Sequence, residues 1–285
     1  MKVRVPASSA NLGPGYDTLG LALSLYTTVE IHESDRTVVN ATGAGADLVV
    51  DDNHLAVAVA KSVLGHRNVA ITIDSEIPLA RGLGSSAALA VAVAAAAGAY
   101  DAFVVASDFD GHCENAGASY LGGLVGGARF DDGWELVSLP IDPRISAVVV
   151  VPAVELSTKE ARSVVPVTIP TADAVFNLQH LVFLLSGLAD LDLLMPAYGQ
   201  ERIHEGPRER LYPDALVIKE ILLDHGARIA TWSGAGTSML GIFERDEATE
   251  KANLIREVLE SSAITADAWH LEVDRDGLSV LDDSE

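Results

Sequence analysis

A run of glycine and serine near residue 80 has the residue types of a phosphate-binding loop. Its sequence is Pro78-Leu79-Ala80-Arg81-Gly82-Leu83-Gly84-Ser85-Ser86-Ala87-Ala88. The glycines let backbone N–H groups turn inward with no Cβ in the way, and the start of the helix that follows adds unpaired N–H donors. Such a nest of N–H groups suits a polyphosphate, and the hydroxyl of Ser86 could reach a magnesium ion.

The same run has a second, purely structural interpretation. No Gly-Lys-Ser or Gly-Lys-Thr closes it, so it is not a Walker A loop. A glycine-rich turn capped by serine before an alanine-rich helix would have the same composition, because glycine-rich loops are weak signals on their own. The loop alone leaves both interpretations open.

The elements that would position this loop follow from hydrophobic periodicity. Alternating or short apolar runs predict strands at residues 2–5, 26–31, 38–42, 68–73, 145–151 and 269–273. The strand at residues 269–273 is predicted to be the last element of the chain. Helical patterns cover residues 54–64, 171–194, 213–225 and 247–261, and Asp52 or Asn53 would cap the first of them. Residues 120–139 and 230–243 are predicted as strands joined by tight turns, whereas the turn-rich run 6–17 is predicted to be neither helix nor strand.

Strands and helices are mixed here without a regular strand–helix alternation, which favours the α+β class. A boundary is predicted at Pro140-Ile141-Asp142-Pro143, so residues 1–143 and 144–285 would form two domains. The tail, residues 282–285, is predicted to be solvated.

Composition excludes several partner classes. The 285 residues carry 41 acidic and 19 basic side chains, a formal net charge of -22, which repels nucleic acid and anionic membranes. The longest apolar stretch, residues 87–97, is too short to span a bilayer, and the first residues lack the apolar core of a signal peptide. Cys113 is the only cysteine, which fits a reducing cytoplasm. A salt-adapted host and an ordinary acidic protein both remain open.

Several motifs in the same order along the chain carry a resemblance to a known family. The loop at residues 78–88 looks like the phosphate loop of the GHMP kinases, and Ser233-Gly234-Ala235-Gly236-Thr237-Ser238 is similar to their third motif. Pro6-Ala7-Ser8-Ser9-Ala10-Asn11-Leu12-Gly13-Pro14-Gly15-Tyr16-Asp17 resembles the opening motif of the homoserine kinases in particular. The runs at residues 156–162 and 173–178 resemble the same subgroup.

The resemblance implies a fold and an activity. Residues 1–143 would be the N-terminal ATP-binding domain and residues 144–285 a C-terminal ferredoxin-like domain, with ATP, Mg²⁺ and substrate in the cleft between them. The expected reaction is ATP-dependent phosphorylation of the L-homoserine side-chain hydroxyl to O-phospho-L-homoserine, in threonine biosynthesis. The alternatives are a GHMP kinase for another small alcohol and a catalytically impaired paralogue that only binds a ligand. A homodimer is left open.

The resemblance also assigns residues. Asn11 and Asp17 would face the substrate, with Asp17 bonded to its hydroxyl or ammonium, and His112 and Asn115 would contact it as well. Arg208 and His180 would hold the substrate carboxylate. The catalytic set would then be Asp17, Ser86 and Arg208, and residues 78–88 would bind ATP. Each assignment has a structural alternative. Asp17 could close a turn, His112 could have a purely structural role, and Arg208 could be an exposed arginine.

This chain departs from the family pattern around the metal. The segment between Ala88 and His112 is shorter than expected by roughly a helix and its loop, and the family's magnesium-binding glutamate lies in that segment. Asp108, Asp110 or Glu114 would have to replace it, and Ser86 with Glu114 is the predicted metal pair. At three further positions this chain differs from the family pattern. Glu114 and Glu201 stand where the family has an aspartate, and His180 stands where it has an arginine.

Overall fold

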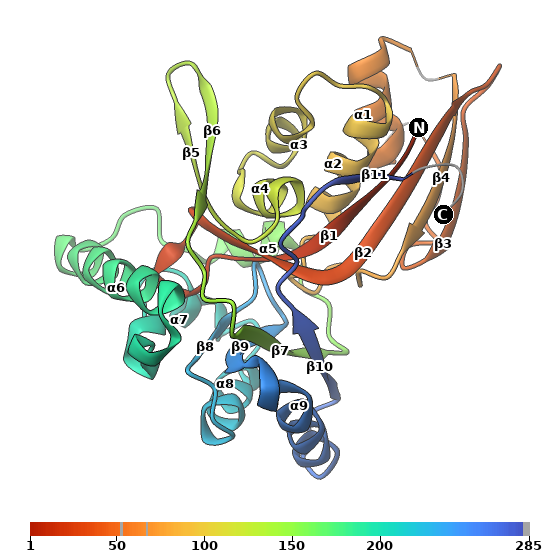
Figure 1. Ribbon diagram of the computed structural model, residues 1–285. Helices are drawn as coiled ribbons and strands as arrows, with labels where there is room; N and C mark the ends of the chain where they lie inside the picture. The colour runs from red at the N-terminus through yellow and green to blue at the C-terminus, as the bar shows by residue number, and fades with distance from the viewer. Residues whose placement is uncertain (52–53, 67, 282–285) are drawn as a thin grey trace.

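The structure is a computed structural model that describes residues 1–51, 54–66 and 68–281. Its strands form two sheets, and its helices lie in separate groups beside them (Figure 1). The architecture is therefore α+β, as the sequence predicts.

The first sheet is built around one long strand. Its described members are β1 (Lys2–Ala10), β2 (Leu19–Glu33), β3 (Val38–Gly43), β4 (Val69–Ser75), β5 (Leu124–Phe130), β6 (Gly133–Leu139) and β11 (Ser279–Leu281). β2 pairs along its length with β1; its first residues also pair with β5, and its second half pairs with β4. Because β2 changes partner midway, the β5–β6 hairpin leaves the main sheet and stands apart from it (Figure 1).

Four helices, which share small or aliphatic buried side chains, cover one face of this sheet. They are α1 (Leu55–Leu64), α2 (Ser85–Ala96), α3 (Ala102–Asp110) and α4 (Glu114–Leu121). The alanines of α2 are almost all buried, so the helix lies close to the backbones of β1 and β2. The N-terminus of α2 is thereby fixed at the end of the sheet, where the phosphate loop begins.

The second sheet has the strand order of a ferredoxin-like fold. β7 (Ile145–Pro152), β8 (Ile229–Trp232), β9 (Met239–Glu244) and β10 (Ala266–Glu272) pair antiparallel in the order β10-β7-β9-β8. α8 (Asp214–Asp224) and α9 (Arg245–Glu260) pack on one face and close the second core. All residues of β7 are buried: Val148 and Val150 face this second core, and Val149 faces the first. The two sheets therefore pack as one body through β7.

The remaining helices lie between and beside the sheets. They are α5 (Thr158–Ser163), α6 (Thr171–Ala189) and α7 (Glu205–Arg208), with short 3-10 turns at Gly13–Gly15, Leu191–Leu193 and Pro196–Gly199. α6 packs its Leu184 and Leu188 into the first core and touches the turns at Gly13–Gly15 and Pro196–Gly199.

Four element predictions need correction. Residues 6–10, read as turn, continue β1, because Pro6 sits at a register shift where a missing N–H is tolerated. The segment 102–121 forms α3 and α4, so Tyr120 is helical. The helix from residue 171 ends at Ala189 rather than 194. Residues 269–273 do not end the ordered chain, because β11 follows and pairs with β1.

The domain division at residue 143 stays a prediction, although β11 places three late residues on the first sheet. The predicted cap of α1, Asp52 or Asn53, and the tail 282–285 lie outside the described residues.

Candidate active site

The phosphate loop has a backbone that only glycine fits. Gly82 and Gly84 have φ of +75° and +68°, a region that other residues rarely adopt. A Cβ on Gly82 would lie 2.1 Å from the carbonyl oxygen of Ser233, and one on Gly84 would lie 2.0 Å from the hydroxyl of Ser8. α2 starts at Ser85 directly after this bend, so its unpaired N–H groups open toward the space in front of the loop.

The second glycine turn, residues 233–238, is packed against the first. The Ser233 hydroxyl donates to the Gly82 carbonyl at 2.7 Å, which leaves it to accept from the Ser9 hydroxyl at 2.8 Å. The two glycine runs and β1 therefore form one rigid unit. This contact fixes the loop from behind and leaves its N–H groups facing the pocket.

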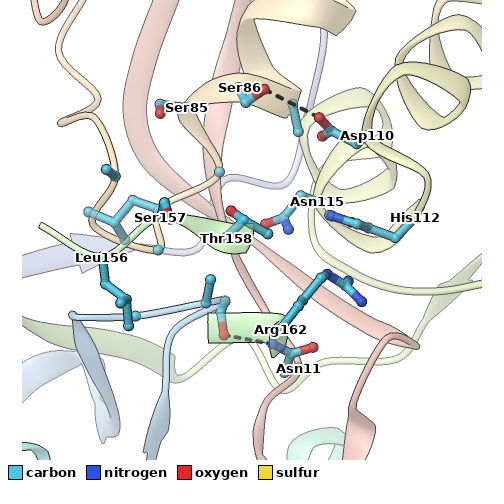
Figure 2. Close-up of a pocket in the computed structure, with 18 of the residues that line it drawn as sticks. Asn11, Ser85, Ser86, Asp110, His112, Asn115, Leu156, Ser157, Thr158 and Arg162 are labelled. Atoms are coloured by element: carbon cyan, nitrogen blue, oxygen red, sulfur yellow. Dashed lines mark hydrogen bonds between the residues drawn. The ribbon is translucent and has the colours of Figure 1, made fainter. Parts of the chain in front are cut away.

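A pocket of about 430 Å³ lies in front of this unit. One part of its wall comes from the phosphate loop, the C-terminal end of α3 and the N-terminal end of α4. The other part comes from α5 and the loop before it, from α7 and from the turn at 234–236. Figure 2 shows Ser86 and Asp110 at one end of this space and Asn11 and Arg162 at the other. The pocket thus joins residues from both sheets.

Ser86 and Asp110 form the first polar group of the pocket. The Ser86 hydroxyl donates to Asp110 Oδ1 at 3.2 Å (Figure 2). Burial raises the pKa of Asp110, although His112 and Ser86 act in the opposite direction. A buried carboxylate without a compensating cation is unfavourable, so this position favours the approach of positive charge.

His112 and Glu114 form the second polar group of the pocket. Glu114 is almost fully buried, and its Oε1 lies 3.0 Å from His112 Nδ1, close enough for an ion pair. Burial would lower the pKa of His112, but the bond and charge of Glu114 outweigh it and raise that pKa. Glu114 Oε2 is buried without a hydrogen-bond partner in the described part of the chain. Asn115 lies beside them, held by the Ser8 hydroxyl at 2.9 Å.

The third polar group of the pocket consists of Asp17, Asn11 and Arg162. Arg162 donates from both terminal nitrogens to the two Asp17 oxygens, at 2.7 and 3.0 Å. Burial would lower the pKa of Arg162, but its bonds to Asp17 reverse this and raise it. Asn11 Oδ1 accepts from the Asp17 backbone N–H at 3.0 Å, and its Nδ2 donates to the Gly234 carbonyl at 2.7 Å. Both side-chain atoms of Asn11 are thus engaged, which indicates a positioning role for Asn11.

Arg208 is the most buried cation of the pocket. Its Nη1 donates to the Gly234 carbonyl at 2.9 Å and to His204 Nδ1 at 3.0 Å. Its Nη2 makes no hydrogen bond within the described residues. Burial lowers the pKa of Arg208, and an arginine nevertheless stays charged at any working pH. The guanidinium therefore retains donors for a ligand.

His204 explains how Arg208 is held. It is fully buried, its ring stacks on Tyr16, and its Nε2 lies 2.9 Å from the Gly13 carbonyl. A carbonyl can only accept, so Nε2 carries the proton and Nδ1 is free to accept from Arg208. Burial lowers the pKa of His204, which keeps the ring in this neutral form. Glu201, the nearest acid, is occupied by three backbone N–H groups at the start of α7.

Comparisons with known proteins agree with this geometry. Residues 53–123 match the family model described as GHMP kinases N terminal domain. A homoserine kinase of Microchaete diplosiphon is 34% identical, over 99% of this chain and 97% of its own length. A homoserine kinase of Caldicellulosiruptor bescii is 32% identical over the same shares. This chain belongs to the GHMP kinase family. The crystal structure of homoserine kinase from Cytophaga hutchinsonii superposes with a TM-score of 0.85 and 26% identity, over 99% of this chain and 97% of that one.

As a GHMP kinase the chain uses ATP, and the metal that accompanies ATP can be tested against the residues present. Mg²⁺ prefers oxygen ligands and needs only one or two carboxylates beside phosphates and water. Asp110 and Ser86 supply such oxygens at the head of α2. Asp108 is turned away and accepts from Trp134 Nε1 at 2.9 Å, outside the pocket. The residues present fit the ion: Ser86 and Asp110 offer oxygens at the head of α2, and the predicted pair of Ser86 and Glu114 stays a prediction.

The predicted site residues of this GHMP kinase mostly come together. Asn11, Ser86, His112, Glu114, Asn115 and Arg208 line the pocket, and Asp17 is bonded to its wall through Arg162. The predicted phosphate-loop residues lie along one edge, although Pro78, Leu79, Arg81 and Ala88 do not line the pocket. Arg81 instead donates to the Pro152 carbonyl and braces the loop from behind.

His180 is the exception. It lies on α6 outside the pocket, with Nδ1 2.9 Å from the Phe176 carbonyl and its ring stacked on Phe176. The geometry places Arg162, not His180, beside Arg208. The sequence reasoning missed Arg162, although its motif at 156–162 was recognised, and it missed His204. The His-x-x-x-Arg spacing of His204 and Arg208, one helical turn, was the available signal.

Proposed function

We propose that this chain transfers the γ-phosphoryl group of ATP to the side-chain hydroxyl of L-homoserine, giving O-phospho-L-homoserine and ADP. The observation that carries the proposal is the composition of one pocket. Two arginines and a buried carboxylate with a free oxygen line it, opposite an N–H-rich loop at the start of a helix. An amino acid offers the complementary carboxylate and ammonium, and ATP offers the phosphates.

The substrate carboxylate would bind Arg162 and Arg208. Both guanidiniums line the pocket, and each retains N–H donors beyond those already bonded to Asp17, His204 and Gly234. Arginine holds a carboxylate through parallel hydrogen bonds and stays charged at any working pH. Two such groups select an anionic end and reject a neutral polyol.

The substrate ammonium would bind Glu114. Its Oε2 is the buried pocket oxygen without a partner, and an unpaired buried carboxylate oxygen is costly unless a donor reaches it. The neighbouring His112, whose pKa Glu114 raises, lies 3.0 Å from Oε1, so Oε2 is the oxygen left for a ligand. Glu114 thus serves the substrate rather than the metal.

The attacking hydroxyl would be oriented by Asp17. Arg162 and Asn11 fix Asp17 at the pocket wall, so a carboxylate oxygen can accept the hydroxyl hydrogen bond. In the reaction the hydroxyl oxygen forms a bond to the γ-phosphorus, the bond from that phosphorus to ADP breaks, and the hydroxyl proton passes to Asp17. Positioning of this kind accounts for much of phosphoryl-transfer catalysis.

The phosphates of ATP would lie against the N–H groups of residues 82–86. Mg²⁺, when bound, neutralises phosphate charge, and Ser86 and Asp110 would hold it there.

The compartment proposed for this reaction is the cytoplasm, where ATP is available and the buried Cys113 stays a thiol. The role proposed in the cell is the homoserine step of threonine biosynthesis, as in the relatives that bear the name homoserine kinase.

Calorimetric binding with a nonhydrolysable ATP analogue and Mg²⁺ tests the substrate assignment. Each of three homoserine analogues lacks one group: 3-aminopropan-1-ol the carboxylate, 4-hydroxybutanoate the ammonium and L-2-aminobutanoate the hydroxyl. Loss of the carboxylate should weaken binding by about 10²-fold or more, because two cationic groups lose their partner. Glu114→Gln should weaken homoserine binding but leave 4-hydroxybutanoate unchanged. Equal affinity for 3-aminopropan-1-ol and homoserine would contradict the proposal.

A further inference from the structure

Tyr16 lies where the two pocket arginines, Arg162 and Arg208, come together. The centre of its ring is 5.9 Å from the Cζ atom of Arg162 and 5.5 Å from the Cζ atom of Arg208. Both distances are within the range of about 6 Å at which a guanidinium is attracted to the π electrons of an aromatic ring. One ring therefore contacts both cations that the proposed function assigns to the substrate carboxylate.

The ring of Tyr16 is itself packed against a buried neighbour. The His204 ring stacks on it, with 4.8 Å between the ring centres and 19° between the ring planes. His204 also accepts from Arg208 through Nδ1 at 3.0 Å. Because burial lowers the pKa of His204, the imidazole adds no third positive charge beside the arginines. Tyr16, His204 and Arg208 therefore form one cluster, and Arg162 joins it at the ring of Tyr16.

The turn that carries Tyr16 directs this side chain. Tyr16 directly follows the 3-10 turn Gly13–Gly15, and the next residue, Asp17, has a φ of +52°, in the left-handed region. Asn11 holds this conformation, because its Oδ1 accepts from the Asp17 backbone N–H. Two consecutive side chains thus reach Arg162, Asp17 through hydrogen bonds and Tyr16 through its ring.

Tyr16 acts on the arginines and not on the ligand. Arg162 and Arg208 line the pocket, whereas Tyr16 does not. Its hydroxyl makes no hydrogen bond within the described residues, and burial raises the pKa of Tyr16, so the side chain stays an uncharged phenol. What it offers its neighbours is therefore the aromatic face.

Two guanidiniums that share one ligand repel each other. Burial is the main cause that lowers the pKa of Arg208, and the charge of Arg162 acts in the same direction. Asp17 offsets the repulsion at Arg162, and the electron-rich face of Tyr16 offsets it at both arginines. The ring thus stabilises the pair in the absence of a carboxylate.

We propose that Tyr16 is a positioning residue, and that attraction to its ring holds Arg162 and Arg208 side by side, ready to receive one carboxylate. The proposal rests on the proposed function, because it takes the substrate carboxylate as the shared ligand of the two arginines. A residue in this role affects binding of the carboxylate end of a ligand and leaves binding of the ammonium end and of ATP unchanged.

Calorimetric binding with a nonhydrolysable ATP analogue and Mg²⁺ tests the proposal. Tyr16→Leu keeps an apolar side chain but removes the aromatic face. It should weaken binding of L-homoserine and of 4-hydroxybutanoate by the same factor, on the order of 10-fold, because both present a carboxylate to the arginines. Binding of 3-aminopropan-1-ol, which has no carboxylate, and of the ATP analogue should not change. Tyr16→Phe keeps the ring and should bind all of them as the wild type does.

A second variant keeps the shape of the ring and changes only its electrons. Trifluorinated phenylalanine at position 16 has a less electron-rich face than phenylalanine, so it should weaken binding of the two carboxylates by about 3-fold relative to Tyr16→Phe. Binding of 3-aminopropan-1-ol should again be unchanged. This variant tests the proposal even if Tyr16→Leu does not fold.

Tyr26→Leu is the matched control, because Arg4 lies over the ring of Tyr26 with its Cζ atom 4.6 Å from the ring centre, outside the pocket. This variant should bind all three compounds as the wild type does. If Tyr26→Leu weakens the carboxylates as much as Tyr16→Leu does, the effect is not specific to the pocket arginines and the proposal is wrong.

Two kinds of result separate the Tyr16 proposal from the proposed function. A wild type that prefers the two carboxylates, with a Tyr16→Leu variant that keeps this preference in full, overturns the Tyr16 proposal alone. Equal weakening of L-homoserine and 3-aminopropan-1-ol, or no effect of fluorination, overturns it as well. A wild type that binds 3-aminopropan-1-ol as tightly as L-homoserine contradicts the proposed function, and the Tyr16 proposal with it.

Discussion

Arg162 and Asp17 are 145 positions apart in the chain and meet through two parallel hydrogen bonds of 2.7 and 3.0 Å at the wall of the pocket. The pair joins the opening motif on the first sheet to α5 beside the second. Arg162 is thereby held in a fixed orientation next to Arg208, and Asp17 is fixed at the wall of the pocket by the same two bonds.

Arg162→Lys should raise the KM for L-homoserine on the order of 10²-fold and leave the KM for ATP nearly unchanged. Lysine offers a single point charge, so it cannot hold Asp17 through two bonds and a substrate carboxylate as well. Steady-state kinetics in both substrates measures this. Arg245→Lys is the control, because Arg245 makes an exposed ion pair with Glu272 outside the pocket. Equal effects on the two KM values would show that Arg162 supports the fold and not the substrate.

Asp110→Asn should weaken Mg²⁺ binding in the presence of a nonhydrolysable ATP analogue by about 10-fold or more. An amide is a poorer ligand for a hard cation than a carboxylate. Calorimetric titration with Mg²⁺ reads this out without turnover. Asp108→Asn is the matched control, because Asp108 bonds to Trp134 and faces away from the loop. If Glu114→Gln weakens the ion and Asp110→Asn does not, the metal assignment is wrong.

His204→Gln should make the free energy of unfolding less dependent on pH below about pH 6.5. The unfolded chain binds a proton at His204 near pH 6.5, whereas burial lowers the pKa of the folded ring. The wild type is therefore most stable above about pH 6.5 and loses up to about 1.4 kcal/mol per pH unit below it from this residue. Glutamine has no such titration. Urea unfolding from pH 7.5 to 5 should show a steeper decline for the wild type, and parallel profiles would disprove a buried neutral His204.

The same variant separates positioning from structure. Because His204 holds Arg208, His204→Gln should raise the KM for L-homoserine more than the KM for ATP at pH 7.5.

Melting temperature should rise markedly with potassium chloride. A net charge of -22 produces strong self-repulsion that salt screens. Differential scanning fluorimetry from low salt to about 1 M measures it, with a chemically inert sugar at equal osmolality as the control. A flat response would point to an ordinary acidic enzyme.

Local sequence was sufficient where a residue's own backbone requirement decides the structure. Gly82 and Gly84 predicted the phosphate loop, because few other residues adopt their positive φ. Val148, Val149 and Val150 predicted a buried strand, which is buried on both faces.

The local sequence does not predict the structure where contacts between distant parts of the chain determine it. Nothing near residue 279 indicates that β11 returns to pair with β1, and a three-residue strand is too short to show periodicity. Nothing near Arg162 indicates that it meets Asp17. The family resemblance assigns His180 to the substrate carboxylate, but the direction of a helical side chain depends on which face of the helix is buried. Burial of Asn177 and Leu184 turns His180 away from the pocket.

The most direct test of the central claim is turnover. ADP release, with ³¹P NMR of the product, should be measured for L-homoserine and for a panel of L-serine, L-threonine, 4-hydroxybutanoate and glycerol. The expected product is O-phospho-L-homoserine, with kcat/KM for L-homoserine at least about 10-fold above that of every other alcohol, because in the proposed pose only L-homoserine would pair both arginines and Glu114 while its hydroxyl reaches Asp17. A higher kcat/KM for another alcohol, or no ATP-dependent product from L-homoserine, would contradict it.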